Sequence, residues 1–163
     1  MLYNVFMIGG SMKKYFKLFL AVMVCVFLFA GCEKVNVGNY KEGTYYGSVV
    51  DSYGGANAVA TAVVYVDSTG MIKSVFLDTT YTKDDVLTTK KTLGDAYNMK
   101  PASEAGKEWY EQVNLLEAKV VENQNITFMT LNDDGKTDAI AGVTMKIDAL
   151  YKALENALNQ AKK

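Results

Sequence analysis

The chain has 163 residues, of which 50% are hydrophobic, with a mean hydropathy near zero and a formal net charge of −1. This length and composition fit one globular domain. All 17 basic residues are lysines, so the Lys- and Arg-rich surface typical of nucleic-acid-binding proteins is not indicated, and we expect no nucleic acid partner.

The beginning of the chain has the pattern of an export signal. Lys13, Lys14 and Lys17 precede an apolar run over residues 18–30, and Gly31 and Cys32 follow it. This run is too short to span a bilayer, which takes about 20 apolar residues, whereas the order basic, apolar, small is that of a secretory signal. Because residues 1–11 carry no charged side chain, we expect the natural start at Met12 and a signal peptide that ends at residue 31.

The end of this signal, Leu28-Phe-Ala-Gly-Cys32, resembles the lipobox of bacterial lipoproteins, in which the cysteine becomes the lipidated first residue. The resemblance implies a lipid anchor at Cys32 and a location on the outer face of the cytoplasmic membrane. Residues 32–41 would then be the lipidated cysteine and a tether, and residues 42–163 the folded domain. An ordinary secretory signal with an unrelated cysteine is the alternative.

Beyond Cys32 the chain contains neither cysteine nor histidine. Disulfides, iron–sulfur clusters, haem held by His or Cys and typical zinc sites are therefore excluded. Catalysis by a Ser-His-Asp or Cys-His arrangement is excluded as well. Any redox role would have to rest on an organic cofactor.

The first half of the domain is rich in β-branched and aromatic residues and predicts three strands, over residues 43–50, 58–66 and 71–79. Gly54-Gly55 separates the first two strands. Asp67-Ser-Thr-Gly70 separates the other two and predicts a tight hairpin turn, with the glycine supplying a positive φ.

Two helical regions are expected next, from Asp84-Asp85 to about Tyr97 and from Ser103 to about Asn123, with a loop at Pro101 between them. A strand over residues 126–131 and a turn over 132–136 follow. That turn resembles part of a calcium loop but lacks the glutamate that such a loop needs. The order of elements predicts the α+β class, an antiparallel sheet with helices packed on it.

The C-terminal region carries the clearest helical pattern. Apolar residues recur there at helical spacing, namely Ile147, Leu150, Tyr151, Leu154, Ala157, Leu158 and Ala161. This stripe predicts an amphipathic helix that begins near Thr144. Thr144 would be its N-cap, a role that typically contributes about 1 kcal/mol, and the unpaired N–H groups at the helix start would favour a phosphate.

The segment before this helix, Asp138-Ala-Ile-Ala-Gly142-Val143-Thr144, resembles the attachment motif of the FMN-binding domain family. That family includes the G subunit of Rnf complexes, the C subunit of sodium-pumping NADH:quinone reductase and lipoproteins of extracellular electron transfer. The resemblance covers about residues 40–161. It implies FMN joined through its phosphate to the hydroxyl of Thr144 by a flavin transferase, with Asp138, Gly142 and Val143 as motif residues of the cofactor site.

A second group of residues, from Tyr97 to Ser103 together with Trp109 and Gln112, is rich in side chains that can stack on or hydrogen-bond a flavin ring. Similar sequences occur in the lipoprotein branch of the family, which implies that Met99 and Trp109 flank the flavin. The helical spacing of Trp109 leaves a core position as the alternative.

The resemblance implies a covalent flavoprotein that transfers electrons, rather than an enzyme that converts a substrate. A membrane quinone-linked reductase would be the electron donor, and an extracellular electron acceptor would receive the electrons. The alternative is a lipid-anchored binding or structural module of the same fold that carries no flavin, with Thr144 only a helix cap.

Overall fold

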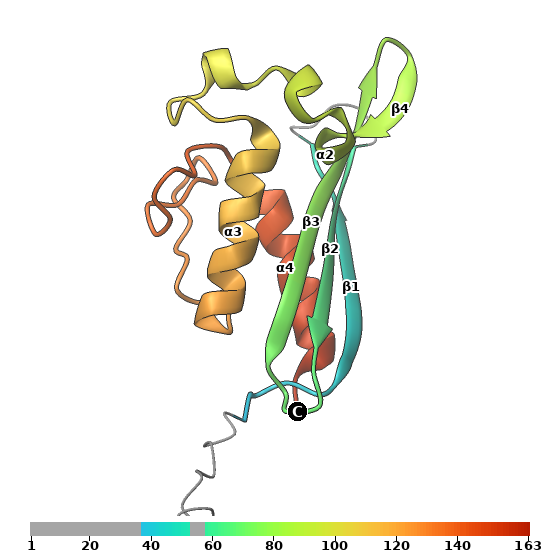
Figure 1. Cartoon of the computed structure of the whole chain (residues 1–163), viewed down its shortest axis with the longest axis vertical. Helices are drawn as coiled ribbons and strands as arrows, with labels where there is room; N and C mark the ends of the chain where they lie inside the picture. Colours follow the sequence, from blue (N-terminus) through green and yellow to red (C-terminus); the bar gives the residue numbers. More distant parts are fainter. Residues whose placement is uncertain (1–36, 53–57) are drawn as a thin grey trace, which may run out of the picture. The chain divides into compact units, whose positions relative to one another are not determined.

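The computed structural model describes residues 37–52 and 58–163 (Figure 1). The expected signal sequence, Cys32, the first residues of the expected tether and Gly54-Gly55 lie outside the described residues. Within the described ranges, no helix has both the length and the apolar character that crossing a bilayer requires.

Four strands form one antiparallel sheet in the order β1-β2-β3-β4. They are β1 (Gly43–Val50), β2 (Val59–Val66), β3 (Ile72–Lys83) and β4 (Val86–Thr89). The three predicted strands are confirmed, but β3 continues beyond residue 79. Asp84 and Asp85, which we expected to begin a helix, instead have φ of 50° and 62° and form the two-residue turn into β4.

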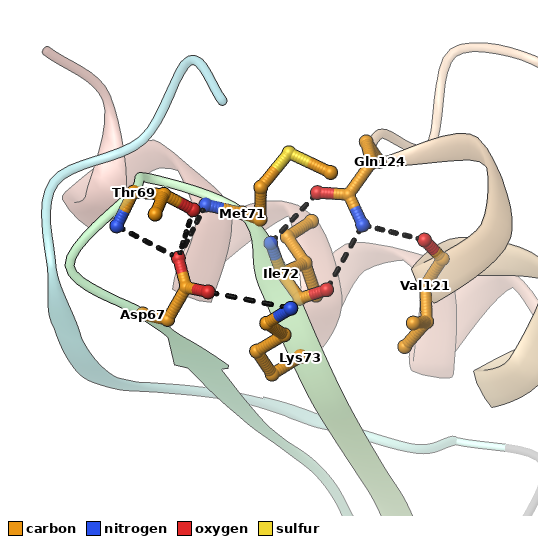
Figure 2. A network of polar contacts seen from close by, with 7 residues as sticks. All are labelled: Asp67, Thr69, Met71, Ile72, Lys73, Val121 and Gln124. Carbon is orange, nitrogen blue, oxygen red and sulfur yellow. Dashed lines mark hydrogen bonds and ion pairs between the residues drawn. The ribbon is translucent and has the colours of Figure 1, made fainter. Parts of the chain in front are cut away.

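The predicted turn between β2 and β3 is confirmed, and Asp67 stabilises it (Figure 2). Asp67 Oδ1 accepts the Thr69 hydroxyl at 2.6 Å and the backbone N–H groups of Thr69 and Met71 at 2.9 and 3.1 Å. These bonds, that of the Thr69 hydroxyl foremost, lower the pKa of Asp67 to about 2. The carboxylate therefore serves as the acceptor that closes the hairpin.

The helical elements are α2 (Lys90–Leu93), η1 (Gly94–Tyr97), η2 (Lys100–Ala102), α3 (Trp109–Asn123) and α4 (Asp148–Ala161). The helix expected up to Tyr97 is thus replaced by a hairpin and short helical turns. α3 ends where predicted but begins at Trp109 rather than near Ser103, because Ser103 O accepts the Gly106 N–H at 2.9 Å in a separate turn. The strand expected over residues 126–131 is absent there, since Asn125 Oδ1 accepts the Thr127 N–H in a local turn.

The apolar stripe of the C-terminal helix is confirmed. Ile147, Leu150, Leu154, Ala157, Leu158 and Ala161 are all buried. The predicted start of the helix is wrong, however. α4 begins at Asp148 with Ile147 as its N-cap, so Thr144 lies outside the helix and does not cap it.

Helices α3 and α4 cover one face of the sheet, which confirms the α+β prediction (Figure 1). The inward-facing residues of β2, namely Ala60, Ala62, Val64 and Val66, are 0% exposed. β1 approaches α4 closely at Gly47, where a Cβ would lie 1.9 Å from Ala153 O and 2.7 Å from Ala157 N. Backbone contact between β1 and α4 therefore requires a glycine at this position.

Amide side chains of both helices bind backbone groups at the edges of the sheet. Gln124 on α3 accepts the Ile72 N–H at 2.7 Å and donates to Ile72 O at 2.9 Å (Figure 2). Gln160 on α4 donates to Tyr46 O at 2.7 Å, and Asn156 donates to Ser48 O at 3.4 Å. These bonds occupy backbone groups with which another strand could pair.

The residues expected to end the tether pack against the domain. Tyr40 forms a β-bridge with Lys162, and the Lys41 N–H donates to Ala161 O at 2.7 Å. The Gly38 N–H donates to Thr69 O at 2.9 Å. Residues 38–41 therefore join the end of α4 to the turn between β2 and β3.

The close contact at Gly47 yields a stability prediction. Gly47→Ala should lower the free energy of unfolding by about 1–3 kcal/mol, because the added methyl group forces β1 away from the backbone of α4. Urea denaturation followed by circular dichroism measures this. Ser48→Ala, at the exposed neighbouring position, is the control and should change stability little. Equal stability of the two variants would contradict the close packing of β1 on α4.

Candidate functional site

A cavity of about 500 Å³ lies beside the first turns of α3 and α4. This volume is within the range of about 300–1,000 Å³ that is usual for ligand and cofactor sites. Met99, Trp109 and Thr144, which the sequence analysis assigned to a flavin site, all line this cavity. They come from three separate parts of the chain, the loop before α3, the first turn of α3 and the segment before α4.

The remaining motif residues have a different role. Asp138 is exposed, and neither it nor Gly142 or Val143 lines the cavity. Val143 is 3% exposed and belongs to the hydrophobic core, and Gly142 has a φ of 84° in the turn before it. These residues shape the segment that presents Thr144, so the expectation that they contact the cofactor is not supported by their positions.

Gln112 holds Thr144 in place. Its side chain is 0% exposed, and Oε1 accepts the backbone N–H groups of Thr144 at 2.9 Å and Met145 at 3.2 Å. Nε2 donates to Ser103 Oγ at 2.9 Å. The sequence suggested Gln112 as a flavin contact, but its amide is used to join α3 to the segment before α4.

Glu108 positions Met99 in a similar way. Its side chain is buried, and its two carboxylate oxygens accept the N–H groups of Met99 at 2.8 Å and Lys100 at 3.1 Å. The backbone N–H of Glu108 donates to Glu111 Oε2 at 2.7 Å. The loop that carries Met99 is thereby tied to the start of α3, directly before Trp109.

Lys90 is a buried cation in the wall of the cavity. It is 5% exposed, and its Nζ lies 5.3 Å from the ring centroid of Trp109 and 5.6 Å from that of Tyr97. Asp51 Oδ2 lies 3.8 Å from Nζ. Burial lowers the pKa of Lys90, while Asp51 and Asp78 oppose this shift. No sequence pattern indicated this residue, because a lysine next to another lysine ordinarily indicates a solvated surface.

Thr79 on β3 also lines the cavity. It is 1% exposed, and its Oγ1 is a buried side-chain atom that has no hydrogen-bond partner among the described residues. A buried hydroxyl without a partner costs about 1–3 kcal/mol, so such groups usually have a partner or a function. An acceptor or donor atom of a molecule in the cavity would satisfy it.

The first turn of α4 completes the cavity. Asp148, Ala149 and Leu150 line it, together with Lys136 and Lys146. The first N–H groups of a helix have no acceptor within the helix and favour an anion, so the predicted anion-binding end lies at Asp148 rather than at Thr144. Each lysine already has an acidic neighbour, Glu104 at 3.3 Å from Lys136 and Asp148 at 3.3 Å from Lys146.

The cavity therefore combines three chemical features. Aromatic and thioether side chains can contact a planar ring, the first N–H groups of α4 can bind an anionic group, and Thr144 supplies a hydroxyl. These residues fit a ligand that has a planar ring and a phosphate, as FMN does.

The role of Gln112 yields a prediction. Gln112→Leu should lower the free energy of unfolding by about 1–3 kcal/mol, because it leaves the N–H groups of Thr144 and Met145 buried without an acceptor. Hydrogen exchange measured by mass spectrometry should show faster exchange in residues 143–147. Asn114→Ala, at an exposed position of the same helix, is the control. Unchanged exchange in that segment would show that Gln112 does not position Thr144.

Comparison with known proteins gives one informative match. No family model matches the sequence, and no curated protein matches it. A solution NMR structure of a protein from Clostridium thermocellum is 32% identical, with a TM-score of 0.51, and the match covers 76% of this chain and 93% of that one. The description of that structure states neither an activity nor a ligand. At this identity over nearly all of the clostridial protein, the chain belongs to the same family as that protein.

Proposed function

We propose that the protein is an electron carrier with FMN attached through a phosphoester to Thr144. One observation carries the proposal: Met99, Trp109 and Thr144, chosen from the sequence by their resemblance to a flavoprotein family, line one cavity of suitable volume. Met99, Trp109 and Thr144 are separated in the sequence, so their spacing alone did not predict that they line the same cavity. Membership of the FMN-binding domain family is part of this proposal.

The residues of the chain have distinct tasks in this function. A flavin transferase would join Thr144 Oγ to the phosphorus of a flavin whose phosphate is activated as a phosphoanhydride. The anhydride P–O bond would break as the Oγ–P bond forms and the hydroxyl proton is lost, so that the chain carries FMN less one water. The N–H groups at the start of α4 would stabilise the phosphate charge. Trp109 and Met99 contact the ring. The bound flavin supplies the reversible uptake of electrons that no side chain here offers.

Covalent attachment suits a protein that works outside the cell. A cofactor bound without a covalent bond is lost when its free concentration falls below the dissociation constant, and the surroundings of an exported protein are dilute. The proposal also includes export and a lipid anchor at Cys32. A membrane quinone-linked reductase would donate the electrons, and an extracellular acceptor would receive them. The observed start of α4 supports the proposal in one respect. Because α4 begins at Asp148, Thr144 is not its N-cap, and helix capping does not explain the threonine.

The attachment can be tested directly. The wild-type chain, co-expressed with a flavin transferase, should fluoresce on a denaturing gel and gain the mass of one FMN less one water. Thr144→Ala should do neither, whereas Thr130→Ala, at an exposed threonine outside the cavity, should behave as the wild type. Flavin retained by Thr144→Ala would move the attachment elsewhere. Absence of flavin from the wild type, with a transferase that modifies a positive-control acceptor, would favour the module without flavin.

The anchor is tested separately. Cys32→Ala should move the protein from the membrane fraction to the soluble or culture fraction, or stall it as the precursor, because the cysteine is the site of lipid attachment. Cell fractionation with immunoblotting measures this. Normal processing with unchanged membrane association in Cys32→Ala would rule out the lipid anchor and leave the flavin proposal untouched.

A further inference from the structure

Lys90 and Thr79 stand out among the residues of the cavity because packing alone does not explain them. Each is buried and polar, and each lines the cavity. Their backbones also lie next to each other. Thr80 on β3 pairs with Thr89 on β4 at the end of this strand pair, and Thr79 and Lys90 are the residues directly beyond that pair.

The ammonium of Lys90 retains hydrogen-bonding capacity. Asp51 Oδ2, at 3.8 Å from Nζ, occupies at most one N–H donor of the ammonium. Contact with the faces of Trp109 and Tyr97 stabilises the charge but takes up no directed hydrogen bond. An ammonium carries three N–H donors, so donors remain for a ligand in the cavity.

Two carboxylates act on the charge of Lys90 against the effect of burial. Burial lowers its pKa, and the carboxylates of Asp51 and Asp78 act in the opposite direction. Asp78 Oδ1 accepts the N–H groups of Thr79 at 2.8 Å and Lys91 at 3.1 Å. These bonds hold the Asp78 carboxylate to the backbone of Thr79 and of Lys91, the residue that follows Lys90.

We propose that Lys90 and Thr79 form the polar subsite for the ring of the bound flavin, where they donate hydrogen bonds to its nitrogen and carbonyl acceptors, and that Lys90 raises the midpoint potential. This inference rests on the function proposed above. Reduction of the flavin adds two electrons and one proton to the ring. The reduced ring therefore carries one more negative charge than the oxidised ring. A fixed cation beside the ring stabilises that charge, and charges at this place are a general means by which proteins tune flavins.

The test compares midpoint potentials of the flavin-loaded protein, with dithionite as reductant in a spectroelectrochemical titration. Lys90→Met should shift the potential to a more negative value, because the reduced ring loses its cationic neighbour. Lys152→Met is the charge-matched control. Lys152 is exposed on α4, pairs with Glu155 and lies outside the cavity, so this variant should keep the wild-type potential.

Thr79→Val gives a second measurement that does not depend on the folding of the Lys90 variant. Without flavin, this variant should unfold at a higher temperature than the wild type, because it removes a buried hydroxyl that lacks a partner. With flavin attached, the stabilisation gained on loading should be smaller than in the wild type, and the visible absorption band should shift. A merely structural role for Thr79 would leave the gain on loading and the band unchanged.

The outcomes separate the two proposals. A flavin-loaded wild type with an unchanged potential in Lys90→Met would overturn the inference and leave the proposed function intact. If Lys90→Met does not fold, Thr79→Val decides, and an unchanged band with an unchanged gain on loading overturns the inference. A wild type that takes up no flavin from an active transferase overturns both.

Discussion

The candidate site depends on one buried amide. Gln112 joins α3 to two segments that have no regular structure of their own, the turn at Ser103 and the segment that ends at Met145. Both of its side-chain atoms are used, and the residue is wholly enclosed, so water cannot replace these bonds at low cost. The position of Thr144 in the cavity therefore follows from the rigidity of α3, although Thr144 itself lies outside every helix and strand.

Other parts of the domain are held by the same kind of interaction. Side chains in and beside α3 accept hydrogen bonds from backbone N–H groups of loops and of the sheet edge. Glu108 binds the loop of Met99, Glu117 accepts the Leu77 N–H at 2.6 Å, and Gln124 accepts the Ile72 N–H at 2.7 Å. Glu117 lies on α3, and Glu108 and Gln124 are the residues directly before and after it. One helix thus orders a loop, an edge of the sheet and the segment that carries Thr144, and the burial of its apolar face stabilises all of them together.

Sequence patterns predicted the parts of this fold that depend on local preference. The strands, the turn at Asp67 and the stripe of α4 were found because β-branched runs, turn residues and helical spacing are properties of neighbouring residues. The hairpin at Asp84-Asp85 was missed because acidic residues there also suit a helix start. Lys90 and Thr79 were missed for a different reason, since their burial depends on which segments meet in space. Met99, Trp109 and Thr144 were found only through the resemblance to a known motif.

The pairing of Tyr40 and Lys41 with the end of α4 has a consequence for how the domain forms. β1 needs the helix that comes last in the domain, both for the contact at Gly47 and for the bonds from Gln160. Contacts between segments this far apart along the chain form slowly, and none of them can form before α4 has been made. The packing of β1, the first strand of the sheet, is therefore completed only after the rest of the domain is available to fold.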